Sequence, residues 1–164
     1  MKRLLFLPLV FAAMALPLQG ATVSFLVMET GLREDAKANE YSSLWENSLM
    51  EVFFEEGHIV SNSPVLRIDQ KTKAAAEDRE FPNEASADLG EARDGGVDYF
   101  VLATLDFPAG DGKTPGDISI RLYKTRPYQF LYEERYAGKS SSNKNDEFAR
   151  IKQTVRRLLP HLKG

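Results

Sequence analysis

The sequence predicts an α/β (α+β) protein with a single mixed β-sheet of about five strands packed with about three helices. Two segments, residues 22–28 and 97–105, are apolar on both alternating sets of side chains, as in strands that are buried on both faces. Three other segments carry apolar residues at helical spacing, and two alternate as half-buried strands do. The predicted order is strand, helix, strand, helix, strand, strand, strand, helix.

The segment RDGGVDYFVLATLDF, residues 93–107, contains the strand that we predict at the centre of the sheet. Gly95 and Gly96 mark the end of a preceding helix, because paired glycines stop a helix abruptly. The residues from Val97 to Leu105 are largely apolar, so protein should cover this strand on both sides. The segment TVSFLVM, residues 22–28, is predicted as a second interior strand for the same reason.

Three amphipathic helices are predicted to shield this sheet. The first spans about residues 39–56 and carries Trp45 in its apolar stripe, where a core position is expected. The second is short, has Asn83 as its N-cap and leads into the central strand. Asn143 or Asn145 caps the third helix. The apolar face of this last helix consists of Phe148, Ile151, Val155, Leu158, Leu159 and Leu162.

The remaining segments are assigned to loops and shorter strands. Residues 29–39 are polar and contain a glycine, which favours a loop before the first helix. Residues 58–60 form a short strand, and residues 65–68 either extend the sheet or cross its edge. Residues 118–124 and 129–137 are predicted as adjacent antiparallel strands. In the second of these we expect Phe130, Tyr132 and Tyr136 on one side and Gln129, Glu133 and Arg135 on the other.

The first 21 residues have the layout of a secretory signal peptide. Lys2 and Arg3 precede an apolar run from Leu4 to about Leu18, which is too short to span a membrane comfortably. An uncleaved anchor or a buried first helix is the alternative. We therefore expect residues 22–164 to form one globular domain in the periplasm or another exported location. The sequence has no cysteine, so we expect neither a disulfide nor a lipoprotein anchor.

The charge balance excludes some classes of partner. Loss of Lys2 and Arg3 with the signal leaves 19 of the 21 basic residues against 24 acidic ones, a formal charge of −5. General binding to nucleic acid or anionic membranes needs a dominant positive field, so neither is expected. After signal removal we expect no transmembrane segment.

No motif in the sequence predicts a catalytic residue, a metal site or a cofactor. Gly112–Thr114 resembles the end of a phosphate-binding loop. That motif needs a glycine five residues before Gly112, where this chain has Phe107, and a helix after the loop, where a strand is predicted. Asp106, Asp111 and Asp117 lack the spacing of a calcium loop, which favours a hairpin connection. There is no GxSxG, HExxH or cysteine nucleophile. A hydrolase with a dispersed carboxylate pair stays open as the third hypothesis.

Binding is the remaining kind of function. Tyr123, Arg126 and Tyr128 cluster near the turn between the last two strands, where aromatic and arginine side chains can anchor a protein partner. Packing against neighbouring side chains is the alternative for these three residues. A small-ligand pocket at the strand ends, near Glu29–Arg33 or Asp106–Asp117, is the second functional hypothesis.

The segments 22–28, 44–53 and 92–105, the last reading ARDGGVDYFVLATL, resemble a group of bacterial envelope domains. This group contains the amino-terminal domain of TolB, the curli secretion protein CsgG and the LpoB-type activators of penicillin-binding proteins. The resemblance implies the same order of elements and a non-enzymatic accessory domain that engages other envelope proteins. It carries over no functional residue. This chain also lacks the lipid-anchoring cysteine that many such proteins have.

Overall fold

The computed structural model describes residues 20–32, 40–69, 83–108, 114–138 and 143–162. The predicted signal peptide, residues 1–21, lies almost entirely outside these ranges, so it stays a prediction. No helix within the described ranges is long and apolar enough to cross a membrane. The elements, in chain order, are β1 (Thr22–Leu32), α1 (Glu40–Glu55), β2 (Ile59–Asn62), β3 (Leu66–Asp69), α3 (Asn83–Asp94), β4 (Tyr99–Asp106), β5 (Asp117–Thr125), β6 (Tyr128–Ala137), α4 (Lys144–Arg156) and the 3₁₀ turn η1 (Leu159–Leu162).

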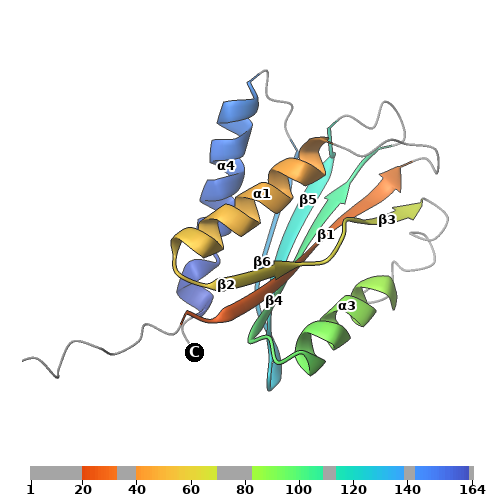
Figure 1. The fold of residues 1–164 in the computed structure, drawn as a ribbon. Helices are drawn as coiled ribbons and strands as arrows, with labels where there is room; N and C mark the ends of the chain where they lie inside the picture. Colours follow the sequence, from red (N-terminus) through yellow and green to blue (C-terminus); the bar gives the residue numbers. More distant parts are fainter. Residues whose placement is uncertain (1–19, 33–39, 70–82, 109–113, 139–142, 163–164) are drawn as a thin grey trace, which may run out of the picture.

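The strands form one mixed sheet in the order β2-β1-β4-β5-β6 (Figure 1). β1 pairs in parallel with β4 on one side and with β2 and β3, one after the other, on its other side. β5 pairs in the antiparallel direction with β4 on one side and with β6 on the other. The predicted central strand is therefore confirmed as the middle strand of the sheet. The predicted fold class and order of elements are also confirmed.

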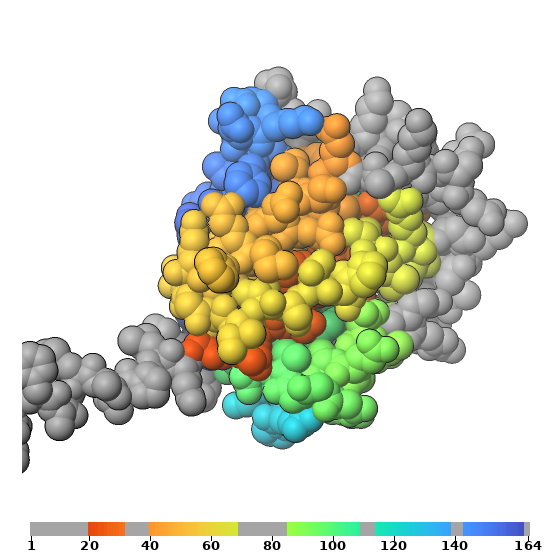
Figure 2. All heavy atoms as spheres, in the orientation of Figure 1, coloured from red at the N-terminus to blue at the C-terminus, as the bar shows by residue number. Residues whose placement is uncertain are grey.

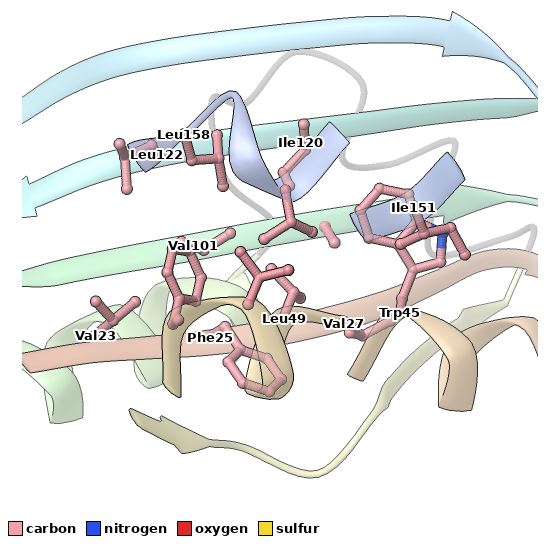
Figure 3. Packing of buried hydrophobic residues seen from close by; sticks show 14 of the residues in the cluster. Val23, Phe25, Val27, Trp45, Leu49, Val101, Ile120, Leu122, Ile151 and Leu158 are labelled. Atoms are coloured by element: carbon pink, nitrogen blue, oxygen red, sulfur yellow. The ribbon is translucent and has the colours of Figure 1, made fainter. Parts of the chain in front are cut away.

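Helices cover both faces of this sheet. α1 and α4 lie side by side on one face (Figure 1), and α3 packs on the other. Trp45 is fully buried among the larger set of apolar side chains, as the sequence predicts. Figure 3 shows how that set joins β1, β4 and β5 to α1 and to α4 with the turn after it. The labelled residues are Val23, Phe25, Val27, Trp45, Leu49, Val101, Ile120, Leu122, Ile151 and Leu158.

Both α1 and α3 end at a glycine in the left-handed conformation. Gly57 has φ +81° and Gly96 has φ +81°. The residue after each glycine donates its backbone N–H five residues back: His58 to the Phe53 carbonyl and Val97 to the Ala92 carbonyl, each at 3.0 Å. This is the Schellman arrangement, which satisfies carbonyls that the helix leaves without partners. The predicted helix stops are thus confirmed.

Two predicted boundaries were wrong. β1 continues to Leu32, although residues 29–32 were assigned to a loop. Hydrogen bonding to β3 on one side and β4 on the other holds this polar stretch in the sheet, and the register shifts between Thr30 and Leu32 to accommodate Gly31. The central strand β4 begins at Tyr99, because Val97 still belongs to the helix stop.

A hydrogen-bonded clasp joins the start of β1 to the residue before β4. Oδ2 of Asp98 accepts from the Thr22 backbone N–H at 2.8 Å and from the Thr22 hydroxyl at 2.7 Å. The Asp98 backbone N–H donates back to the Thr22 side chain at 2.9 Å. The backbone N–H of Thr22, followed by its hydroxyl, holds the pKa of Asp98 below its usual value of 3.8.

This clasp should make the protein sensitive to acid. In the unfolded chain Asp98 regains its usual pKa, so the stabilisation is complete above about pH 4 and is lost as the pH falls through the lower folded value. We expect Asp98→Asn to flatten the acid limb of a plot of unfolding free energy against pH. Urea unfolding at several pH values measures this. An unchanged acid limb in the variant would contradict the assignment.

Candidate functional site

The predicted partner surface lies on the α3 side of the sheet, where β5 turns into β6. Tyr123 is fully buried there and supports two half-exposed rings. Tyr128 stacks on it at a centroid distance of 5.9 Å, and Phe130 packs against it at 5.5 Å. The exposed fractions of Tyr128 and Phe130 are 50% and 46%. We call Tyr123, Tyr128 and Phe130 the aromatic patch.

Arg126 lies in the turn itself and ties it to α3. Its guanidinium donates to the Arg93 carbonyl and lies 3.5 Å from the Asp94 carbonyl, both at the carboxyl end of α3. A cation at this end of a helix interacts favourably with the helix dipole. Figure 2 shows the turn (cyan) emerging directly beside α3 (green). Of the three predicted residues, Tyr128 offers contact area, Tyr123 supports it and Arg126 fixes the turn.

The predicted orientation of Phe130 in its strand was wrong. Its ring was expected to share a side with Tyr132 and Tyr136, opposite Glu133 and Arg135. The ladder between β5 and β6 instead shifts register between Leu122 and Tyr123, so β6 contains an additional residue there. This bulge turns Phe130 to the face that carries Glu133 and Arg135, which is why the patch is larger than predicted.

Charged side chains continue the same face along the two strands. Glu133 accepts from Arg121 at 2.7 Å and from Arg135 at 2.8 Å. Burial acts to raise the pKa of Glu133, but these two hydrogen bonds outweigh it and lower the pKa below its ordinary value. The two arginines and the glutamate thus form an ordered network beside the aromatic patch.

The strand ends predicted as a ligand pocket are occupied by the protein's own polar groups. Glu29 is fully buried and accepts from the Ser42 hydroxyl and from Nε of Arg67, the latter at 2.9 Å. The Thr30 hydroxyl donates to Asp106 at 2.7 Å. Both carboxylates are therefore engaged within the sheet and α1.

The other residues of the predicted ligand pocket lie partly in described and partly in undescribed segments. Arg33 and Asp111 lie outside the described residues. Asp117 faces Asp106 across the antiparallel pair of β4 and β5, as expected of a hairpin connection. Within the described ranges no three His, Cys, Asp or Glu side chains gather as metal ligands.

The basic side chains of α4 form ion pairs with other parts of the same chain. Lys152 pairs with Glu51 of α1 at 2.5 Å, and Arg156 pairs with Glu55 at 3.3 Å. Glu51 and Glu55 on the acidic side of α1 thus bind α4. Arg157 likewise pairs with Glu134 of β6, and Arg150 with the buried Glu147. The pair within α4 orders the helix itself, whereas the pairs with α1 and with β6 hold it on the sheet face opposite the aromatic patch.

The two links between α1 and α4 should differ in strength. Lys152 is only 16% exposed, whereas Arg156 is 50% exposed and more open to screening by salt. We expect Lys152→Met to lower the unfolding free energy by about 1 kcal/mol and Arg156→Met to change it by only a few tenths. Denaturant unfolding at low and high salt measures both. Equal losses would show that burial does not separate the two pairs.

Comparison with known proteins gives a distant structural likeness. No protein-family model and no curated protein matches the chain. The PelC dodecamer from Paraburkholderia phytofirmans superposes with a TM-score of 0.46 at 14% identity, covering 88% of this chain and 89% of that one. The LpoB C-terminal domain from Escherichia coli gives 0.43 at 13%, covering 76% and 87%. TolB from Acinetobacter baumannii gives 0.44 at 10%, covering 86% of this chain but only 29% of TolB.

The LpoB-type and TolB domains to which the sequence was likened are thus among the similar solved structures. The likeness is distant both in identity and in superposition. It assigns no activity and no partner, so the chain's own surface has to indicate the function.

Proposed function

We propose that the chain is an exported, non-enzymatic accessory domain of the bacterial cell envelope that binds another protein through the aromatic patch. The observation that carries this proposal is the half-exposure of Tyr128 and Phe130 above the buried Tyr123. Tyrosine and other aromatic side chains supply a large part of the binding energy in protein interfaces. Two adjacent rings on a sheet face therefore favour protein binding.

The patch is also held in place before any partner arrives. Tyr123 fixes the stacking position of Tyr128, and Arg126 secures the intervening turn to the end of α3. Binding to ordered side chains loses less conformational entropy than binding to mobile ones. This order favours the patch as an interaction surface.

The exported location rests on the amino-terminal segment and on the resemblance of segments 22–28, 44–53 and 92–105 to envelope domains. It is independent of the patch and can be tested separately. Fractionation of cells that produce the chain should recover a shortened form outside the cytoplasm. Recovery of only the full-length form in the cytoplasm would contradict export.

The binding surface is tested by site-specific photo-cross-linking in intact cells. A photoreactive amino acid replaces Tyr128 in one variant and Asn47, exposed on α1, in a matched control. We expect one discrete cross-linked protein from position 128 and none of the same mass from position 47. The same adduct at both positions, or no adduct at position 128, would contradict binding through the patch.

A further inference from the structure

β6 presents a backbone edge as well as a side-chain surface. Among the described residues only β5 pairs with it. The Gly138 N–H donates to the Gly116 carbonyl at 2.8 Å, which fixes the phase of the ladder. Along an antiparallel strand the N–H and C=O groups of successive residues point alternately to one edge and to the other. The even-numbered residues from 132 to 136 therefore direct their N–H and C=O groups toward β5. Glu133 and Arg135 direct their backbone N–H and C=O groups toward the outer edge of the sheet.

The hydrogen bonds between β5 and β4 lead to the same assignment of inward and outward backbone groups. The Thr125 N–H donates to the Asp98 carbonyl at 2.9 Å, so the odd-numbered residues of β5 bond to β4 and the even-numbered ones to β6. The side chains of Glu133 and Arg135 lie on the face of Tyr123. The same two residues thus carry the outward backbone groups and the side chains next to the aromatic patch.

The charges on this face point to the kind of partner. On this face of the β5–β6 hairpin three arginines, Arg121, Arg126 and Arg135, stand against two carboxylates, those of Glu133 and Asp117, although the whole chain has a formal charge of −3. A locally positive face on an acidic protein favours an acidic partner.

We propose that the edge of β6 adds an extended, acidic segment of another protein as a further strand of the sheet. The segment places an apolar side chain beside Phe130 and a carboxylate beside Arg135, while its backbone bonds to the outward groups of Glu133 and Arg135. β6 is 10 residues long, which gives such a segment several bonding positions. The inference rests on the proposed function, because it specifies how the partner binds.

Synthetic peptides distinguish backbone pairing from side-chain contact. The probe is a fluorescent peptide of about eight residues that alternates threonine with valine and ends in glutamates. Two further peptides carry N-methyl groups on one or the other alternate set of backbone amides. We expect one methylated set to weaken binding to the purified chain about tenfold or more and the other set to bind like the parent. Equal binding by both sets would overturn strand addition.

Variants of the chain test the edge from the other side. Arg135→Pro removes an outward N–H, which an edge strand tolerates, whereas Arg135→Thr removes the arginine side chain with its charge but keeps the N–H. We expect both to weaken binding of the glutamate peptide, with the proline variant about tenfold weaker than the threonine variant. Unchanged far-UV circular dichroism and unfolding midpoints establish that each variant is folded. Equal binding by the two variants would overturn the backbone contact.

Charge and self-association provide two further outcomes. Arg135→Glu should bind a lysine version of the peptide better than the glutamate version; the opposite order would overturn the acidic partner. A stable dimer that Arg135→Pro dissociates would identify a second copy as the occupant and also overturn the proposal. A discrete adduct from position 128 in cells, with peptide binding indifferent to methylation, would leave the proposed function intact and remove only strand addition.

Discussion

Replacing Gly31 by alanine is expected to cost far more stability than the same change at Gly57 or Gly96. All three glycines have nearly the same positive φ, from +81° to +82°. An alanine in this conformation costs roughly 1–2 kcal/mol through backbone strain alone. At Gly57 and Gly96 nothing lies within 4 Å of the added Cβ, so this strain is the whole expected effect.

At Gly31 the added Cβ would lie 2.2 Å from the carbonyl oxygen of Phe107. That carbonyl belongs to backbone and cannot rotate away, and the Phe107 N–H is bonded to the Thr30 carbonyl at 2.8 Å. Forcing β1 away from the end of β4 adds an overpacking cost of about 1–3 kcal/mol. We therefore expect Gly31→Ala to lower the unfolding free energy by about 3 kcal/mol or more.

Urea unfolding followed by circular dichroism measures the three variants under identical conditions. Gly57→Ala and Gly96→Ala serve as matched controls for the strain of positive φ. If all three variants lose the same unfolding free energy, the Cβ of residue 31 does not contact Phe107. The register shift of β1 at Gly31 would then be wrong.

The sequence reveals the sheet because apolar pattern and burial agree there. Residues 99–105 are apolar on both alternating sets, and the structure places them between β1 and β5 with helices on both faces. The glycines after α1 and α3 were recognisable for a similar reason, since their effect is local to the chain. Fold class and order of elements follow from such local signals.

The extension of β1 and the bulge in β6 could not be found in this way. Glu29 and Gly31 are typical of a loop by composition, and only pairing with β3 and β4 holds them in a strand. The bulge near Leu131 leaves no mark in the alternation of β6, so Phe130 was assigned to the opposite face. Both errors arise where tertiary contacts override local preference.

The candidate site was predictable only in part. Tyr123 and Tyr128 flank a short turn, so their proximity follows from the hairpin itself. The bond from Arg126 to the end of α3 joins residues 33 positions apart and has no sequence signal. The burial of Glu147 is equally hidden, because a carboxylate in the first turn of a helix is expected to interact with the helix dipole whether or not it is buried.

Removing Arg67 is expected to destabilise the protein much more than altering its partner Glu29. Glu29 is fully buried, whereas the Arg67 side chain is 41% exposed. Arg67→Met leaves a carboxylate in the interior whose remaining hydrogen-bond donor, among the described residues, is the Ser42 hydroxyl, which should cost about 3 kcal/mol. Glu29→Gln keeps an acceptor at the same place and leaves a guanidinium that water reaches, so we expect a loss of about 1 kcal/mol.

A combined variant decides whether this asymmetry comes from the buried charge. Glu29→Leu together with Arg67→Met and Ser42→Ala removes the carboxylate and both of its donors, which leaves no polar group of this trio in the interior. Replacing a buried ion pair by apolar residues is often close to neutral, so the triple variant should be more stable than Arg67→Met alone. Unfolding free energies from urea titration measure this coupling. If the effects of the three changes simply add, Glu29 does not depend on Arg67, and the loss in Arg67→Met reflects other contacts of the arginine side chain.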